Sequence, residues 1–509
     1  MINLPDSATS SRTLRRQSGF IMMAGVLAIF VAACVFLSLH RAPWWDEGIY
    51  ADSSSNLALK GFFGSTRWHS YIPGLVPNLP ALGQYTYWST PLYLVSLAGV
   101  FRTFGFSIVA MRAWSIWWGC VLIVSWYFIV LALTRGSRRA GLLAAAFVGT
   151  DATIILAAST GRADCMVAAL GAAGMACYLQ LRQSRMNLAI LAGASLEVAA
   201  IFSHPIAAIH VGTAVLMVLI LDWRQLRVRH LFLAALPLLV AFLGWGAYIA
   251  QAPEVFKAQF LGHISHRAGG LSSPLRALLT EFQGRYLLYY WTEYHGVTKL
   301  KVLFLASYVA SCVFLLAAPG IRRRAPGLRL LAVLAVTAYA LLALFDPIRG
   351  PVYLIHTFSY LAAAFGATVW WLTQEPGPRK LYVAAATALA LLQLSGIAYK
   401  IRQDTTANIY RPVVEYVRAH APADGFVIGP NELLFGLGPQ FGFQDDPRLG
   451  LGTARAPDMI IRGPFAIAAR DIEREEPQTA QFVRERLTHE YRIVFENEEY
   501  QLYQRDEKN

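Results

Sequence analysis

The stretch "WWDEGIYAD" (44–52) begins a few residues after the first long apolar run of the chain ends. It places two adjacent carboxylates, Asp46 and Glu47, at the edge of a membrane, with Asp52 about one and a half helical turns further on. Carboxylates at that depth are costly unless they are solvated, paired or bound to a cation. The pattern therefore indicates either a solvated helix end or a functional site in which a carboxylate accepts a proton from an attacking hydroxyl.

More ionisable and aromatic residues fall where other apolar runs end, on what we predict to be the same side of the membrane. They are Arg162, Asp164, His204, Asp346, Arg349 and Tyr353, together with Lys257, His263, His266 and Arg267 in a long loop. Each has an ordinary explanation by itself, since an arginine at a membrane turn usually extends its charge to the interface. Together they predict an outer face of acids, histidines and arginines above an apolar interior. Arginine and histidine suit a phosphate, so the predicted chemistry is group transfer from a lipid phosphate.

The composition is that of an all-α polytopic membrane protein. The chain has 509 residues, of which 56% are apolar and 15% charged, against about 25% charged in soluble domains. The net charge of +13 comes mainly from short connectors between apolar runs, so it predicts membrane orientation and no nucleic-acid partner. All five cysteines lie inside apolar runs at irregular spacing, which favours packing over a metal site or disulfides.

The apolar runs predict eleven spans. They are 18–39, 108–133, 140–158, 164–181, 187–203, 205–221, 231–250, 302–319, 329–345, 352–373 and 381–399. With this count the basic connectors, such as "TRGSRR" and "GIRRRAPGLR", all fall on one side, which is the cytoplasmic side by the positive-inside rule. The first run lacks a small-residue cleavage site, so we expect it to be retained as an anchor.

One apolar segment, 91–105, tests this scheme. It is short for a span and contains Arg102, and counting it as a span would place every later basic connector outside. We therefore predict an interfacial helix on the outer surface.

The resulting domain organisation has three parts. A cytoplasmic tail (1–17) precedes a membrane domain (18–400), whose long outer loops are 40–107 and 251–300. The remainder (401–509) is polar and predicts a small α/β domain outside, with an amphipathic helix at "IYRPVVEYVRAHAP", a strand at "GFVIGP" and a hairpin at "YRIVFENEEYQLYQ".

Several motifs resemble the GT-C glycosyltransferases. They are the Asp-Glu pair followed by Tyr50, the Pro-Leu-Tyr start of the interfacial helix, the "FG" before "AMRAWS" in the second span, and the Arg-Ala-Asp at 162–164. The chain is most similar to the branch of protein O-mannosyltransferases and of aminoarabinose transferases that modify lipid A. The resemblance covers about residues 18–400 and is strongest from 44 to 119.

The resemblance implies a polyprenyl-phosphate-linked sugar donor and a glycolipid, glycan or protein acceptor. It implies that the sugar is transferred with inversion at its anomeric carbon, on the outer face of the cytoplasmic (inner) membrane and in contact with membrane lipids.

The resemblance also implies roles for individual residues. Asp46 matches the catalytic carboxylate, Glu47 stands beside it, and Asp164 matches a second catalytic acid. The other predicted substrate-binding residues are Tyr50, Arg162, His204 and Tyr353, and His263 resembles a ligand of a divalent metal ion. Since parts of the family's phosphate site are missing, phosphate binding must come from Arg349, Arg267 or Arg67, or the chain represents a divergent subfamily with another donor. The chain departs from the family pattern where Ile49 replaces an arginine, where His204 replaces a phosphate-holding lysine, and near Ser89 and Thr90, where an acid is missing.

A secondary transporter or lipid flippase is the main alternative, with a structural membrane protein as a third class. A transporter is expected to carry charges within its spans and to have repeated halves. The ionisable residues noted here concentrate at the outer ends of the spans, apart from Glu197 and Arg112, and no repeat is visible.

Overall fold

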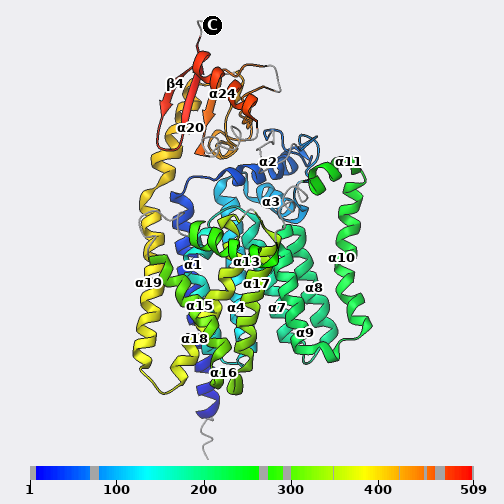
Figure 1. The fold of residues 1–509 in the computed structure, drawn as a ribbon, viewed down its shortest axis with the longest axis vertical. Coiled ribbons are helices and arrows are strands. Elements are labelled where there is room, and N and C mark those ends of the chain that lie inside the picture. Colours follow the sequence, from blue (N-terminus) through cyan, green and yellow to red (C-terminus); the bar gives the residue numbers. More distant parts are fainter. Residues whose placement is uncertain are drawn as a thin grey trace, which may run out of the picture.

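The computed structural model describes residues 7–68, 79–262, 273–289, 300–347, 349–422, 425–451, 455–464 and 476–506, with side chains from residue 19 onward. Most of the chain is a bundle of long helices, and a small domain with a β-sheet stands at one end of it (Figure 1). The predicted class, a multi-pass helical membrane protein with a small C-terminal α/β domain, is confirmed.

Each of the eleven predicted spans corresponds to helical structure. The helices are α1 (Ser7–His40), α4 (Ile108–Leu133), α5 (Arg138–Thr150) with α6 (Ala152–Ala158), α7 (Ala163–Leu181), α8 (Met186–Ser203), η1 (Pro205–Ala207) with α9 (Ala208–Asp222), α10 (Val228–Ile249), α15 (Lys301–Ala317), α17 (Pro326–Phe345), η6 (Pro351–Leu354) with α18 (Ile355–Gln374), and α19 (Arg379–Gln403). Among the described residues, nine helical segments are long and apolar enough to cross a membrane. The pair α5 and α6 makes a tenth if it is counted as one span bent by 64°, and α15, with 17 residues, is shorter.

A buried polar cluster stabilises the bend between α5 and α6. Asp151 caps α6 by accepting hydrogen bonds from the amides of Thr153 and Ile154 at 2.9 and 3.1 Å. Its other oxygen accepts a hydrogen bond from the hydroxyl of Tyr308 at 2.6 Å. The side-chain oxygen of Gln393 accepts a hydrogen bond from the amide of Ala152, the first residue of α6, at 2.7 Å. Since backbone groups released inside a membrane need internal partners, these side chains make the bend possible.

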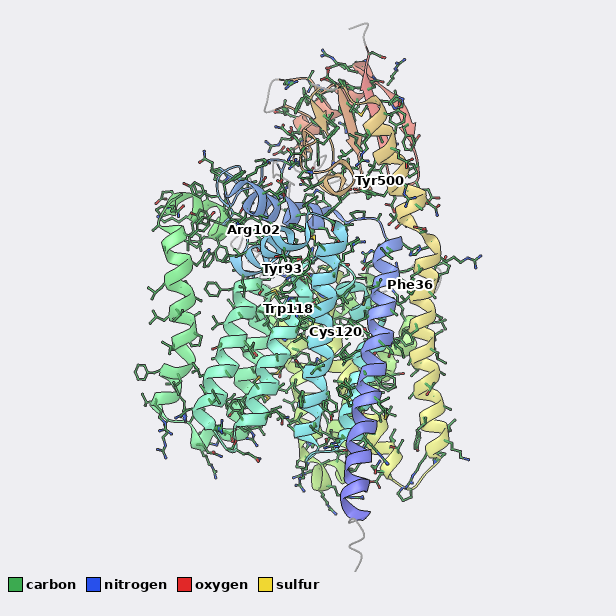
Figure 2. All side chains as sticks on the ribbon, turned by 180° about the vertical axis from the view of Figure 1, so that it is seen from behind. Phe36, Tyr93, Arg102, Trp118, Cys120 and Tyr500 are labelled. Carbon is green, nitrogen blue, oxygen red and sulfur yellow. The ribbon has the colours of Figure 1, made fainter. Side chains whose placement is uncertain are left out.

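Two shorter helices lie across the end of the bundle below the C-terminal domain, α2 (Trp45–Lys60) and α3 (Pro91–Phe104) (Figure 1). α3 has 14 residues, too few to span a membrane, as its sequence predicts. Its buried face includes Tyr93, whereas Arg102 is exposed (Figure 2). Further short elements are α11 (Pro253–Phe256), η3 (Lys257–Leu261), α13 (Pro274–Glu281) and η4 (Phe282–Tyr289) at this end, and α16 (Pro319–Arg324) at the other.

The C-terminal domain grows directly out of the last long helix. η7 (Thr406–Tyr410) and α20 (Arg411–His420) continue α19 upward into it (Figure 1). A five-stranded sheet follows in the order β2 (Phe443–Gln444), β1 (Val427–Ile428), β3 (Met459–Arg462), β5 (Gln501–Arg505) and β4 (Tyr491–Glu496), accompanied by α21 (Leu433–Leu437) and α24 (Pro477–His489). β1 pairs in parallel with β2 and β3, and β5 is antiparallel to β3 and β4. The predicted amphipathic helix, buried strand and hairpin are all present.

Candidate active site

The first turn of α2 carries the Asp-Glu pair. Trp44 precedes the helix in an extended conformation, and its amide donates to Oε2 of Glu47 at 2.8 Å, which fixes where the helix begins. An acid in the first turn also lies at the positive end of the helix dipole. Both effects are local, and they set Asp46 and Glu47 on different sides of the same turn.

Glu47 faces the bundle and is fully buried. Arg112 of α4 donates to both of its oxygens, from Nε at 2.9 Å and from Nη2 at 2.7 Å, and the amide of Gly161 donates at 2.6 Å. Burial raises the pKa of Glu47, but Arg112 outweighs burial and holds the pKa below its ordinary value. A carboxylate enclosed by four donated hydrogen bonds has no surface left for a substrate. We therefore assign Glu47 to positioning and not, as its sequence suggested, to catalysis.

Arg112 joins three helices through this pair. Besides Glu47 it donates to the backbone oxygens of Ser38 at 2.6 Å, Arg41 at 2.8 Å and Ala42 at 3.1 Å. These carbonyls lie at the end of α1, where no further helical amide can reach them. The single guanidinium thus ties the end of α1 and the start of α2 to α4.

Asp46 lies at the mouth of the bundle. Its carboxylate pairs with the guanidinium of Arg162, and 26% of its side chain is exposed. Arg162 also donates from Nε to Asp164 at 2.7 Å, and its guanidinium lies 4.9 Å from the ring of Trp44. The structure therefore brings together three residues that the sequence placed at one membrane level, with one arginine between two acids.

A chain of histidines leads from Asp164 into the bundle. Nε2 of His356 lies 3.7 Å from Oδ1 of Asp164, and Nδ1 of His356 lies 2.9 Å from Nε2 of His210. The other nitrogen of His210 is 3.1 Å from the hydroxyl of Tyr360. Neither histidine is among the residues predicted from the sequence; the signal that points to them is a lone histidine within an apolar run.

Tyr353 and His204 lie next to this chain. The ring of Tyr353 is 5.9 Å from that of His204 and 6.1 Å from that of His356. His204 also caps η1 by accepting the amide of Ile206 at 3.2 Å. Two predicted substrate-binding residues from separate loops are thus brought to the Asp164 side of the site.

An arginine cluster continues the site beyond Tyr353. Arg285 is fully buried, lies 5.9 Å from the Tyr353 ring, and pairs with Glu281 at 2.6 Å and with Asp346 at 2.8 Å. Arg349 lies beside Glu281 at 3.9 Å, and 24% of its side chain is exposed. Arg285 is therefore occupied by two acids, whereas the more exposed Arg349 is placed to reach a ligand.

The whole architecture resembles that of a known enzyme. Crystal structures of ArnT from Cupriavidus metallidurans, bound to undecaprenyl phosphate and in the apo state, match with TM-scores of 0.59 and 0.60 at 14% identity. The matches cover 95% and 98% of this chain, and 97% and 98% of ArnT. The chain has the GT-C fold. An oligosaccharyltransferase from Archaeoglobus fulgidus also matches, with a TM-score of 0.49, 12% identity and coverage of 92% of this chain and 69% of its own. No protein-family model and no curated protein sequence matches the chain.

Two of the predicted substrate-binding residues make their described contacts within the protein. Arg67 is buried; it pairs with Asp52 at 2.9 Å and donates to the backbone oxygens of Pro439 and Phe441 in the C-terminal domain. Tyr50 packs between Trp88 and Tyr93, each 5.5 Å away between ring centroids. Arg67 therefore joins the first predicted outer loop to the C-terminal domain, and Tyr50 packs against Tyr93 of α3; their substrate-binding roles stay predictions.

The predicted metal ligand His263 and the predicted phosphate ligand Arg267 lie outside the described residues. Within the described ranges, no group of three or more His, Cys, Asp or Glu side chains could hold a metal ion.

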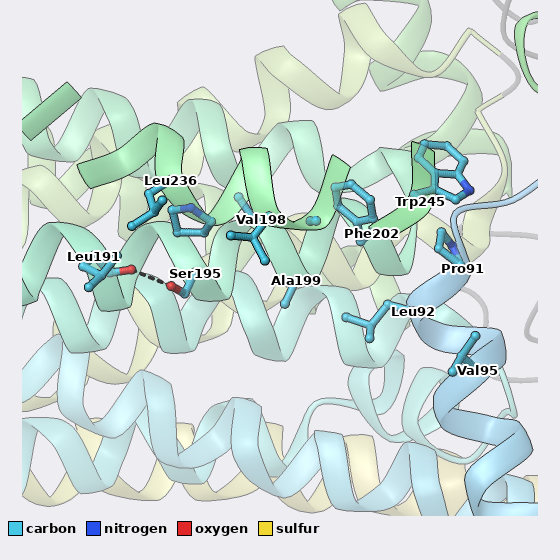
Figure 3. A pocket seen from close by; sticks show the side chains of 13 residues that line it. Pro91, Leu92, Val95, Leu191, Ser195, Val198, Ala199, Phe202, Leu236 and Trp245 are labelled. Carbon is cyan, nitrogen blue, oxygen red and sulfur yellow. Dashed lines mark hydrogen bonds between the residues drawn. The ribbon is translucent and has the colours of Figure 1, made fainter. Parts of the chain in front are cut away.

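An apolar groove, here called the α3 groove, runs down the bundle from the start of α3 (Figure 3). It has a cavity volume of about 630 Å³ and lies between α3, α8 and α10. Leu92 and Val95 of α3, Phe202 of α8 and Trp245 of α10 are among its lining residues. The hydroxyl of Ser195, also in the lining, is turned to the backbone oxygen of Leu191 at 2.8 Å. Tyr93, adjacent to Leu92, contacts Tyr50 instead, so the groove and the acid cluster lie on two sides of α3.

Proposed function

We propose that this GT-C protein is a membrane glycosyltransferase that moves a sugar from a polyprenyl-phosphate donor to an acceptor hydroxyl, with inversion. The observation that carries this proposal is the geometry of Asp46, a partly exposed carboxylate held by Arg162 at the mouth of the bundle. The fold supports the same assignment, since ArnT was crystallised with undecaprenyl phosphate.

In the proposed reaction the acceptor oxygen attacks the anomeric carbon while Asp46 takes its proton. The bond from the anomeric carbon to the phosphate oxygen breaks, and the phosphodiester leaves as a monoester with an additional charge. The sugar passes through a state like an oxocarbenium ion, near which the negative charge of Asp164 is favourable.

Cationic groups must stabilise the leaving phosphate. Arg162 is already paired with two carboxylates, so a phosphate that approaches it competes with Asp46 and releases that carboxylate for proton transfer. Arg349, His204 and the hydroxyl of Tyr353 are the other groups on this side that we propose for the phosphate. Arg267, and a divalent metal ion held by His263, stay predictions for a segment outside the described residues.

The direct test is transfer by the purified protein in proteoliposomes, with polyprenyl-phosphate sugars as donors and glycolipid, glycan or protein acceptors offered in turn. A covalent product identified by mass spectrometry supports the proposal, as does loss of the same product from the cell envelope of a deletion strain. Acceptor-dependent release of the polyprenyl phosphate gives the rate.

Glu197 is the observation that favours a transporter or flippase. It is buried in α8, and among the described residues neither of its carboxyl oxygens has a hydrogen-bond partner. Movement of a lipid-linked or small anionic substrate across vesicles with no covalent product would replace the glycosyltransferase proposal by this one.

We further propose that the polyprenyl chain of the donor lies in the α3 groove. Replacing Ala199, a lining residue, by Trp fills part of the groove, so we expect KM for a long-chain donor to rise about tenfold with kcat little changed. The measurement is steady-state transfer with a long-chain and a short-chain donor. The short-chain donor should be unaffected, and Val336→Trp on an exposed face of α17 is the matched control. An equal rise of KM for both donors would count against this placement.

We also propose that the protein lies in the cytoplasmic (inner) membrane with α2 and the C-terminal domain on the periplasmic or extracellular side. β4 and α16 lie at opposite ends of the molecule (Figure 1), and each carries an exposed arginine, Arg492 and Arg323. A cysteine replacing Arg492 should react with an impermeant maleimide in intact cells, and one replacing Arg323 should react only after permeabilisation. The reverse labelling pattern would show that the protein has the opposite orientation in the membrane.

A further inference from the structure

The start of α2 is bonded to the C-terminal domain as well as to the bundle. Trp45, the residue before Asp46, donates its indole N–H to Oδ2 of Asp445 at 2.5 Å. The same oxygen accepts the backbone and side-chain N–H groups of Asn431 at 3.1 and 2.8 Å. A hydrogen bond between residues that are 400 positions apart thus reaches the helical turn that carries the proposed base.

The backbones of α2 and the domain are also in direct contact. A Cβ atom on Gly48 would overlap the backbone carbonyl of Asn431, so only glycine permits this approach. On the other side, the amide of Asp445 donates to the backbone oxygen of Arg67 at 2.9 Å. Asp445 and Asn431 are therefore held against the outer loop by backbone contacts that do not involve Trp45.

A hydrogen bond at the end of α1 also connects the domain to the bundle. The amide of Ala42, at the end of α1, donates to the hydroxyl of Thr405 at 2.9 Å. Inside the domain, the hydroxyl of Tyr410 in η7 donates to the backbone oxygen of Glu432 at 2.7 Å, which holds the segment next to Asn431 to the helical stretch that continues α19. Displacing the domain would therefore move Trp45, and with it Asp46.

We propose that the C-terminal domain orients Asp46 through the hydrogen bond from Trp45 to Asp445, here called the latch, and that Asp445 is a positioning residue of the transfer reaction. The inference rests on the proposed function of Asp46. Glu47 holds one side of the helical turn to the bundle, the latch holds the other side to the domain, and Asp46 lies between them. A catalytic group displaced by about 1 Å can lose about a hundredfold in rate, so loss of the latch should lower kcat without removing substrate binding.

The latch should respond to pH. Burial raises the pKa of Asp445 to about 7. The hydrogen bonds from Trp45 and Asn431 oppose this rise, and the nearby charge of Asp446 adds to it. Glu432 faces Asp445 as well as Tyr500 and Glu499, and burial raises its pKa to about 8. A hydrogen bond to an ionised carboxylate is stronger than one to the neutral acid. The latch therefore tightens as pH rises through the pKa of Asp445, and kcat should increase near pH 7.

The test compares pH profiles of kcat and KM for Trp45→Phe, Asp445→Ala, Asp445→Asn and the parent protein in proteoliposomes. We expect Trp45→Phe and Asp445→Ala to lower kcat about tenfold or more at pH 8, to leave KM for the donor within about twofold, and to lose the rise near pH 7. The double variant of Trp45→Phe and Asp445→Ala should have a kcat no lower than that of either single variant, because both substitutions remove the same hydrogen bond. Asp445→Asn keeps an acceptor oxygen but cannot ionise, so it should recover part of kcat and show no rise.

Two controls separate the latch from general damage. Arg492→Ala, in an exposed part of β4, should leave kcat and its pH profile unchanged. Glu432→Gln should retain the rise of kcat near pH 7, and this result would assign the rise to the titration of Asp445. A Trp45→Phe protein with full kcat and the parental pH profile would overturn the latch. If that variant does not fold, the profile of Asp445→Asn decides, because a retained rise would exclude Asp445. An inactive Asp46→Asn together with fully active latch variants would remove this inference and leave the proposed function intact.

Discussion

Asp46→Asn should lower the rate of sugar transfer at saturating donor by at least about a hundredfold, the usual contribution of a general base. Asparagine has the same shape and keeps an oxygen that accepts the Arg162 guanidinium, so the site should remain assembled. What it lacks is the capacity to take the proton of the attacking hydroxyl. The measurement is kcat for acceptor-dependent release of polyprenyl phosphate in proteoliposomes.

The control for this loss is another acid at the same end of the molecule. Glu254 is 80% exposed and pairs only with the exposed Lys257 among the described residues, so Glu254→Gln should keep full activity. The membrane content and the thermal unfolding midpoint of Asp46→Asn should equal those of the parent protein. Transfer by a folded Asp46→Asn protein at the parental rate would exclude Asp46 as the base.

Arg112→Met should destabilise the protein by about 3–5 kcal/mol, the usual result of removing one partner from a buried ion pair. Methionine is of similar length, but it leaves the fully buried Glu47 carboxylate without its counter-charge. It also removes the donors that serve three carbonyls at the end of α1. The measurement is the free energy of unfolding of the purified protein in detergent, supported by the yield of folded protein.

Removing both charges should do less harm than removing one. In Glu47→Gln combined with Arg112→Met no uncompensated charge is buried, so the double variant should recover part of the lost stability. Arg324 and Glu375 form an ion pair at 2.9 Å in which 66% and 28% of the side chains are exposed. Arg324→Met, the matched control, should change stability by about 0–1 kcal/mol. If the losses from Glu47→Gln and Arg112→Met were simply additive, the two residues would not be coupled.

The sequence by itself determined the helical frame and the region of the site. Whether an apolar run can span a membrane depends on its own length, so the runs predicted the long helices and the short α3 without reference to the rest of the chain. The acids at 46, 47 and 164 could be expected near one another because all three lie close to an end of a span on the same predicted side. The pattern of turns and alternating residues likewise predicted the C-terminal hairpin.

Only the tertiary structure decided which partner each charged group takes. Asp46 and Glu47 are neighbours in the chain, yet one pairs with Arg162 at the mouth of the bundle and the other is enclosed by Arg112, because the first turn of α2 points them to different helices. His356 meets Asp164, and Asp445 meets Trp45, across long separations that no local pattern encodes. Helix formation follows from neighbouring residues, whereas the pairing of buried polar groups depends on which helix ends the packing brings together, and that is a property of the whole fold.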